Sequence, residues 1–488
     1  MQLEKFSGLE IGRLVNSREL RPKEVISYFI NRIKERNPSL NAFVYLKEED
    51  AFAEAQLLED KIMRGEYGGP FAGVPVGLKD FLPSKKGWTH SYGGVKSIIR
   101  IDEADSMFYI AARSAGAIAV GKTNSPHFGF SGTCDNKLYG CTSNPFHLAY
   151  NSGGSSGGTA AAVADGLITF GEGGDAGGSI RIPSAWCNCF GFKASLGTIP
   201  RYCRPDGWSS THPHCFNGAI TRTVADSAVM LNYMAQYNPL DPTSLPINAG
   251  KDFLSLMEKP IKDWKIALTL DYDLFPTDTE IKNMVHDAAM RLTVAGAKVE
   301  LVSFCFQHSL EEFAKTWCQS ISIDTALKLA QWKNEGKDLI RDHRSELSEE
   351  FIYWNTVAAE SDIHFLRKFN EVRTDILDAY ERVFQDYDII ISPVTACNPV
   401  LNQNNGNTRG PKEINSVAVE PVIGFTETFL VNFVGYPAAS VPIGLNTSGL
   451  PVGMQIIGKQ YRDEDVLAVA HKFETIQPWS YDIPFSRM

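Results

Sequence analysis

Two glycine-flanked serine sites, joined by a short apolar run, constrain this chain more than any other feature of its sequence. The first site reads GGSSGG at residues 153–158, and the second reads GGS at residues 177–179. The alanine-rich run between them predicts a buried helix that ends near Gly166. Taken alone, each site fits a flexible serine–glycine loop equally well. Flexible linkers are usually polar throughout, however, so the apolar run favours two sites built on one buried element.

Glycines beside a serine also permit a particular chemistry. Because glycine has no Cβ, main-chain N–H groups at such a site can approach a bound group closely. An oxyanion hole, which stabilises the negative charge that develops on a carbonyl oxygen, can be built from such N–H groups. The two serine sites are therefore candidates for a catalytic centre.

Composition and charge exclude several classes of partner. The 488 residues are 43% apolar, which is ordinary for a globular protein. The net charge is −10 and no long basic run is present, which argues against nucleic acid or an anionic membrane as the main partner. The N-terminus lacks the pattern of a signal peptide, and no apolar run approaches the length of a membrane span. The nine cysteines are scattered along the chain, and we interpret them as free thiols in the reducing cytoplasm.

The hydrophobic pattern predicts alternating helices and short buried strands, and hence an α/β fold. Helices are expected within residues 7–65 (one of them over 24–36, stopping at Asn37-Pro38) and at 105–115, 276–295, 308–386 and 466–474. Strands are expected at 73–80, 117–120, 264–273, 298–302, 388–393, 439–442 and 453–458. The strand–helix–strand order over residues 264–302 predicts that part of the sheet is parallel.

Residues 116–123, GAIAVGKT, formally match the phosphate-binding loop GxxxxGK[ST]. In that loop a strand precedes the first glycine, and a helix begins near the lysine with its N-terminus facing the phosphate. Here a helix precedes the match, a strand lies inside it, and Pro126 follows it closely. We therefore interpret the segment as a strand and not as a nucleotide site.

Two other catalytic patterns receive little support. Ser155 also lies in a GxSxG pattern, but that nucleophile elbow follows a strand and needs a later histidine. Residues 144–151 are typical of a loop, and His471 lies in an amphipathic helix. His212 and His214 form the only close histidine pair near the serines, and the proline between them suits a solvated loop better than a metal site. No metal or cofactor is predicted.

The chain resembles the amidase signature family of serine hydrolases. The matching segments are GVPVGLKD at 73–80, GKTN at 121–124, GGSSGG at 153–158, GDAGGSIRIP at 174–183, ITRTVADSA at 220–228, ISP at 391–393 and GYPAASVPIGLNTSGLPVGMQI at 435–456. The match covers most of the chain except residues 300–380. The segment around the second serine is its most specific part.

We expect the fold of this family, a large mixed, twisted β-sheet covered by helices on both faces, in a single domain over residues 1–488. Residues 1–68 would form an N-terminal helical layer. Residues 69–245 and 381–488 would form the catalytic core, and the variable, largely helical segment 250–380 would line the substrate pocket. Trp317, Tyr353 and Trp354 are candidate walls of that pocket, although packing of helix against core is the more common role for each of them taken singly.

The resemblance implies a Ser–Ser–Lys triad. Ser179 would be the nucleophile, Ser155 the bridging serine that follows a cis peptide bond from Gly154, and Lys79 the ultimate base. The supporting groups would be the oxyanion-holding amides of Ala176, Gly177, Gly178 and Ser179, the hydroxyl of Ser156 near Lys79, and a turn-bracing pair of Asp175 and Arg181. Alternatively, Arg181 clamps a substrate carboxylate, which guanidinium groups bind well.

General chemistry supports these roles independently of the resemblance. A lysine at a strand end usually points to solvent. It can act as a base only when neutral, and burial in an apolar core lowers its pKa toward that state. Asp80 should point to the opposite face of the strand, because successive side chains alternate. The hydroxyl of Ser155 can both donate and accept a hydrogen bond, and can therefore relay a proton from Ser179 to Lys79.

Several residues depart from the family pattern. Since none of them replaces a triad residue, they bear on specificity and not on activity. They are Ala176 in place of threonine, Glu172 in place of an apolar residue, Tyr150 in place of arginine, Phe146 in place of tryptophan, Ala219 in place of proline and Thr198 in place of arginine.

The favoured function is an amidase that hydrolyses a linear or cyclic carboxylic amide of a small molecule through an acyl-enzyme on Ser179, without a cofactor. The layout is similar to hydrolases that open the cyclic dimer of 6-aminohexanoate. The alternative is a glutamine-hydrolysing amidotransferase subunit that delivers ammonia to a partner protein. A catalytically dead binding protein would have no need of the intact triad. The sequence leaves open whether the chain forms a homodimer.

Overall fold

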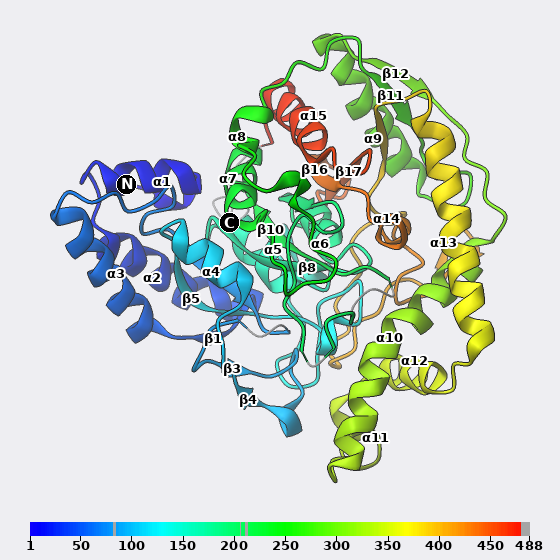
Figure 1. Cartoon of the computed structure of the whole chain (residues 1–488), viewed down its shortest axis with the longest axis horizontal. Coiled ribbons are helices and arrows are strands. Elements are labelled where there is room, and N and C mark those ends of the chain that lie inside the picture. The colour runs from blue at the N-terminus through cyan, green and yellow to red at the C-terminus, as the bar shows by residue number, and fades with distance from the viewer. Residues whose placement is uncertain (82–83, 205, 210–212, 480–488) are drawn as a thin grey trace.

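The computed structural model describes residues 1–81, 84–204, 206–209 and 213–479 (Figure 1). The described residues form an α/β fold around one large mixed sheet, as predicted, with the strand order β1-β5-β2-β8-β10-β9-β16-β17-β13-β11-β12. These strands are β1 (Phe43–Leu46), β2 (Pro75–Lys79), β5 (Ile118–Thr123), β8 (Phe170–Asp175), β9 (Phe190–Lys193), β10 (Phe216–Thr221), β11 (Lys265–Leu268), β12 (Lys298–Leu301), β13 (Ile389–Pro393), β16 (Ala438–Leu445) and β17 (Pro451–Gly458).

Parallel pairs lie toward both ends of the sheet, and antiparallel pairs occupy its centre. β2 is parallel to β5 and to β8, and β11 is parallel to β12 and to β13. The strands from β8 through β10, β9, β16 and β17 to β13 are antiparallel to their neighbours. Strands β11 and β12 with the helix between them form the predicted strand–helix–strand unit.

Helices cover both faces of the sheet, which confirms the predicted layers. The helices are α1 (Gly8–Asn16), α2 (Pro22–Leu40), α3 (Glu48–Met63), α4 (Met107–Ser114), α5 (Gly157–Ala164), α6 (Arg181–Trp186), α7 (Val224–Met234), α8 (Phe253–Leu256), α9 (Thr279–Arg291), α10 (Leu310–Asn334), α11 (Leu339–Asp342), α12 (Glu349–Ala359), α13 (Ile363–Phe384), α14 (Phe429–Val434) and α15 (Asp463–Ile476). In Figure 1, α1 to α3 lie at one end of the molecule and α10 to α13 at the other, with the sheet between them.

Strand β13 shows how the two faces are separated. Ile389 and Ile391 belong to the core that α7, α8, α9 and α15 cover, whereas Ile390 belongs to the core that α6 and α10 to α14 cover. Because successive side chains of a strand point to opposite faces, one run of isoleucines fills two cores.

Helix α2 ends later than predicted. It continues through Pro38 to Leu40, and Asn41 ends it in the left-handed conformation at φ 54°. Leu40 is fully buried, and the main-chain N–H of Asn41 still donates to the carbonyl of Asn37 at 2.7 Å. A proline in the last turn removes only its own N–H donor, so the burial of Leu40 and the asparagine cap set the helix end.

The segment predicted as a loop before the first serine site is a β-hairpin. β6 (Ser143–Asn144) pairs with β7 (His147–Asn151) in antiparallel orientation. Exposed and half-buried side chains alternate along β7, but none is fully buried before Asn151, because the hairpin lies at the surface. Its hydrophobic pattern therefore did not predict a strand.

The GAIAVGKT segment is confirmed as a strand. β5 extends through its lysine, Lys122, which is fully buried and donates from Nζ to Asp102 Oδ2 at 2.9 Å. Burial alone would raise the pKa of Asp102, but the hydrogen bond from His90 and the positive charge of Lys122 lower that pKa to about 2. Lys122 is thus one half of a buried ion pair inside the sheet.

Two further features concern the described residues as a whole. No disulfide joins their cysteines. None of their helices combines the length and the apolar character that crossing a membrane requires.

We predict that Asp102→Asn lowers the free energy of unfolding by about 3 kcal/mol, because it removes the nearer of the two carboxylates that face the buried ammonium of Lys122 and leaves only Asp80, at 3.9 Å. Urea unfolding followed by circular dichroism measures this loss. Glu19→Gln is the control, since Glu19 is paired with Arg13 on the exposed surface and such pairs add little. A loss below about 1 kcal/mol in Asp102→Asn would show that the ion pair does not hold this part of the sheet.

Candidate active site

Sheet topology brings the predicted catalytic residues to one place. β2 and β8 are parallel neighbours, with Val76 opposite Phe170 and Gly77 opposite Gly171. Their carboxyl ends therefore lie at the same edge of the sheet. β2 ends at Lys79, and β8 ends at Asp175, just before the second serine site. Helix α5 packs against both strands and starts directly after the first serine site, so all three segments converge.

Lys79 points into the protein and not into solvent. Its side chain is fully buried, and Nζ donates to Ser155 Oγ at 2.7 Å and to Ser156 Oγ at 2.9 Å. Burial lowers its pKa to about 8, against the smaller opposing effects of the carboxylates of Glu172 and Asp175. Lys79 can therefore lose its proton near neutral pH. The predicted contacts of Lys79 with Ser155 and Ser156 are both present.

The first serine site is held by its main chain. The peptide bond between Gly154 and Ser155 is cis, as the resemblance implies. The N–H of Gly154 donates to the carbonyl of Gly132 at 2.8 Å, and a Cβ at Gly154 would lie 2.3 Å from the carbonyl oxygen of Thr133. Only glycine fits such a close approach of two backbone segments.

Ser179 lies beside this site. The N–H of Ser156 donates to the carbonyl oxygen of Ser179 at 3.2 Å. Within the described part of the chain, no hydrogen bond joins the hydroxyl of Ser179 to that of Ser155. The structure therefore shows the Lys79–Ser155 contact directly and brings Ser179 next to it through the main chain. Ser179 is half-buried, whereas Ser155 is buried.

The four amides predicted to hold an oxyanion are not equivalent. The N–H of Gly178 donates to Asp175 Oδ1 at 2.8 Å, and an amide engaged in this way has no N–H left for an oxyanion. The N–H groups of Ala176, Gly177 and Ser179 have no such partner among the described residues. The prediction is thus corrected for Gly178, whose N–H braces the turn. Its backbone, at φ 122°, still requires glycine.

Groups outside the 176–179 loop hold two of its carbonyl oxygens. Trp317 donates from Nε1 to the carbonyl of Ala176 at 3.0 Å, and Thr428 donates from Oγ1 to the carbonyl of Gly177 at 2.6 Å. A Cβ at Gly177 would lie 2.6 Å from the ring of Trp317. Trp317 therefore contacts the loop directly, which agrees with its prediction as a wall of the site.

Asp175 and Arg181 form the predicted pair. Arg181 is fully buried and donates to both carboxylate oxygens of Asp175, at 2.9 and 3.0 Å. Burial would raise the pKa of Asp175, but the charge and hydrogen bonds of Arg181 lower it to about 2. The other N–H groups of Arg181 donate to Thr428, Asn432 and Gln455. Since its donors are used within the protein, the substrate-clamp alternative for Arg181 is not favoured.

Aromatic rings surround the site, and most of them were missed by the sequence analysis. Gly129 joins the rings to the triad, because a Cβ there would lie 3.3 Å from Ser155 Oγ and 3.1 Å from the ring of Phe81. Phe130 stacks with Trp317 at 6.5 Å between centroids, and Phe128 stacks with Phe351 at 5.0 Å. We call this set the aromatic wall: Phe81, Phe128, Phe130, Trp317 and Phe351. The alternating aromatics of HFGF at 127–130 were the available signal.

The other two predicted wall residues do not join this set. Tyr353 is 59% exposed, with its ring against Trp354. Trp354 is buried in the core, where it hydrogen-bonds the side chain of Glu420. Among the described residues, neither ring makes a hydrogen bond or ring contact with the triad or with the 176–179 loop, so their place in the substrate pocket stays a prediction.

The alternative histidines also lie away from the triad's contacts. His471 lies on α15, with ring nitrogens near Glu258 and Glu474. His214 contacts Arg373, and His212 lies outside the described residues. Among the described residues, no cluster of histidine, cysteine, aspartate or glutamate side chains could hold a metal ion.

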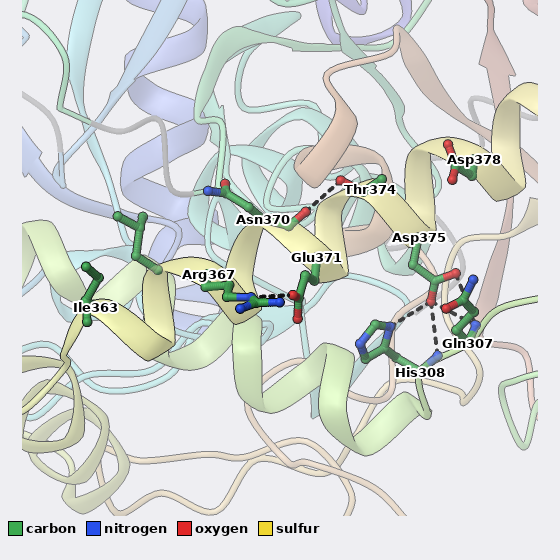
Figure 2. A pocket seen from close by; sticks show the side chains of 10 residues that line it. Gln307, His308, Ile363, Arg367, Asn370, Glu371, Thr374, Asp375 and Asp378 are labelled. Atoms are coloured by element: carbon green, nitrogen blue, oxygen red, sulfur yellow. Dashed lines mark hydrogen bonds and ion pairs between the residues drawn. The ribbon is translucent and has the colours of Figure 1, made fainter.

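A surface hollow of about 690 Å³ lies along α13 (Figure 2), and none of the serines of the two sites lines it. Apart from Asp378, its charged groups are already paired within the protein. Asp375 accepts hydrogen bonds from the main chain of Gln307 and from both the main chain and ring of His308, and Arg367 pairs with Glu371. None of these residues contacts the triad, so we do not assign the hollow to substrate.

Known proteins match this chain over nearly its whole length. A family model described as Amidase matches residues 24–467. An acylamidase of Rhodococcus erythropolis is 31% identical over 484 residues, which cover 98% of this chain and 97% of that protein. A glutamyl-tRNA(Gln) amidotransferase subunit of Geobacillus thermodenitrificans is 33% identical over 495 residues, which cover 97% of this chain and 98% of that protein.

Solved structures give the same picture. A bacterial aryl acylamidase of the amidase signature family is 40% identical, with a TM-score of 0.96 and 99% of each chain covered. The 6-aminohexanoate cyclic dimer hydrolase is 26% identical, with a TM-score of 0.85 and 97% of each chain covered.

We predict that Trp317→Phe slows the reaction of Ser179 with a fluorophosphonate by about ten-fold, because the loss of one hydrogen bond loosens the 176–179 loop. Phenylalanine keeps most of the packing on Gly177 but cannot donate to the carbonyl of Ala176. The rate of labelling, followed by mass spectrometry, measures the effect. Trp264→Phe, just before β11, is the control and should label at the wild-type rate; equal rates in the two variants would contradict the prediction.

Proposed function

The chain belongs to the amidase family, and we propose that it cleaves its amide substrate with Ser179 as the nucleophile, Ser155 as the proton relay and Lys79 as the base. The observation that carries this proposal is the buried amine of Lys79, 2.7 Å from Ser155 Oγ at the edge of the sheet where Ser179 also lies.

Lys79 supplies the base that a serine needs. A serine hydroxyl is a weak nucleophile until a base accepts its proton. With a pKa of about 8, roughly one Lys79 side chain in ten is neutral at pH 7. The neutral amine accepts the proton of Ser155 while Ser155 accepts that of Ser179, since a hydroxyl both donates and accepts.

The reaction then proceeds through an acyl-enzyme. Ser179 Oγ bonds to the carbonyl carbon, and the C–N bond breaks as the proton returns through Ser155 to the leaving amine. Water attacks the ester by the same route and releases the acid. The amides of Ala176, Gly177 and Ser179 are the donors for the oxyanion of both steps, and a donor of this kind contributes about 10²–10³ in rate.

We further propose that the preferred substrates are aryl acylamides, in which an aromatic ring carries the amide nitrogen. The aromatic wall supports this choice, because aromatic side chains pack well against an aromatic substrate ring. The 40% identical aryl acylamidase structure supports it also. This proposal narrows the expectation of a linear or cyclic amide. The cyclic dimer hydrolase, whose layout is also similar, is less similar to this chain, at 26% identity.

The amidotransferase alternative has one observation in its favour. The matching subunit of that enzyme is as similar to this chain as the acylamidase is, at 33% and 31% identity. The expected substrate of that alternative, glutamine, carries an ammonium and a carboxylate, and burying either charge without a partner is costly. The rings of the aromatic wall carry no charge. The charged side chains that share a hollow with Phe130 are held within the protein. Since Arg409 pairs with Glu350 and Asp135 accepts a hydrogen bond from Thr408, we favour the amidase.

Activity should rise with pH through about 8, because the neutral fraction of Lys79 grows as the pH passes its pKa. The pH dependence of kcat/KM on an anilide tests this. Lys79→Met should lower the rate of Ser179 labelling by a fluorophosphonate at least about a hundred-fold. Label on another serine, or full labelling in Lys79→Met, would remove the assignment of nucleophile or base.

Substrate choice is tested with an anilide and glutamine at equal concentrations. We expect kcat/KM for the anilide to be at least about a hundred-fold higher, and Phe130→Ala to reduce it about ten-fold through KM. Tyr353→Ala is the matched control, because that ring is mostly exposed, and it should leave kcat/KM unchanged. Faster turnover of glutamine would favour the amidotransferase function instead.

A further inference from the structure

Glu172 is a buried carboxylate in the strand that leads to the nucleophile. It lies on β8, is 1% exposed, and is opposite Ala219 of β10, which carries no charge. In the amidase signature family an apolar residue is common at this position, so Glu172 is a departure from the family pattern. Burying an unneeded carboxylate is unfavourable, so its presence calls for a function.

The carboxylate of Glu172 holds the backbone of the catalytic lysine. Its Oε2 accepts a hydrogen bond from the main-chain N–H of Lys79 at 3.0 Å. Its own carbonyl oxygen accepts from the hydroxyl of Thr159 on α5, at 2.8 Å. Glu172 thus joins the end of β2 to β8 and, through α5, to the segment that begins with the first serine site.

Several charged groups face this pair. Lys122 from β5 and Asp102, its partner, act on Glu172, as does Lys79 from β2. Asp175 acts on Lys79 together with Glu172, and the thiols of Cys134 and Cys215 are the other titratable groups near that amine. Asp80, next to Lys79 in sequence, points away from this pair and accepts a hydrogen bond from the hydroxyl of Ser91. Since Lys122 is already paired with Asp102 and Asp175 with Arg181, the negative charge of Glu172 is not neutralised by a partner of its own.

The two groups change charge over neighbouring ranges of pH. Burial raises the pKa of Glu172 to about 7, and burial lowers that of Lys79 to about 8. An ionised Glu172 favours the ammonium form of Lys79, and a protonated Glu172 does not. Groups that interact in this way titrate as a pair.

We propose that Glu172 is a positioning residue of the amide hydrolysis, whose carboxylate fixes the end of β2 at Lys79 and whose negative charge favours the protonated form of that lysine. The inference rests on the proposed role of Lys79. By holding a proton on the lysine, the charge of Glu172 moves the onset of activity to higher pH.

Two substitutions separate the two parts of this role. Glu172→Gln removes the charge but keeps an oxygen that can accept from the N–H of Lys79, whereas Glu172→Leu removes both. Asp226→Asn is the matched control, because Asp226 is also a fully buried carboxylate that accepts main-chain N–H groups, those of Gly8 and Leu9. Thermal unfolding of each variant confirms that it is folded before rates are compared.

The measurement is the rate of Ser179 labelling by a fluorophosphonate from pH 5.5 to 10. In Glu172→Gln we expect the midpoint of the acid limb to fall by somewhat less than about one pH unit, with the largest excess over the wild-type rate between about pH 7 and 8, because Glu172 is itself largely protonated below its pKa of about 7. In Glu172→Leu we expect the same shift and a plateau about ten-fold lower, because the lysine is no longer held. Asp226→Asn should follow the wild-type curve.

Two outcomes would overturn the inference: a midpoint in Glu172→Gln equal to that of the wild type, or an equal shift in Asp226→Asn. Lys79→Met distinguishes this failure from failure of the proposed function. If Lys79→Met labels normally, Lys79 is not the base, and both proposals fall. If Lys79→Met is slow and Glu172→Gln keeps the wild-type midpoint, only the role of Glu172 falls.

Discussion

The site depends on the burial of one amine at the end of one strand. An ammonium in contact with water would stay charged at neutral pH, and it could not accept the proton of a serine. The sheet around β2 removes that water, and two serine hydroxyls take the place of a counter-ion at Nζ. Hydroxyls solvate the amine without fixing its charge, whereas a carboxylate at the same distance would keep it protonated.

Neighbouring charges are arranged so that this condition holds. Asp175 could act on Lys79 as a counter-ion, but Arg181 occupies both of its oxygens. Asp80 is adjacent to Lys79 in sequence, but strand alternation turns it toward Ser91 and the ammonium of Lys122. Each strong carboxylate near the base thus has another cation or hydroxyl. Glu172 is the exception, which is why its charge has a direct effect on the lysine.

A helix and a strand that carry the site could be predicted from local sequence. The contacts around them could not, because they depend on turn geometry and tertiary packing. The helix between the serines and the strand ending at Lys79 follow from apolar runs closed by glycine, and both are present. The engagement of the Gly178 N–H by Asp175 depends on turn geometry that residue types do not specify. The aromatic wall combines rings separated by more than two hundred residues in sequence, and only tertiary packing selects Phe351 over the neighbouring Tyr353.

The same long-range packing explains how a glycine-rich loop can serve as a rigid donor array. Gly177 and Gly178 have no side chains with which to hold their own conformation, and free glycines lose much entropy on ordering. Trp317 from α10 and Thr428 from the segment before α14 instead hold the carbonyl side of the loop. The peptide that carries the Ala176 carbonyl also carries the N–H of Gly177, which is one of the amides proposed for the oxyanion, whereas the next peptide carries the N–H of Gly178, which Asp175 holds. A helix of the variable segment therefore fixes the backbone of the loop at Ala176, and in the proposed reaction this contact would orient a group that stabilises the developing charge.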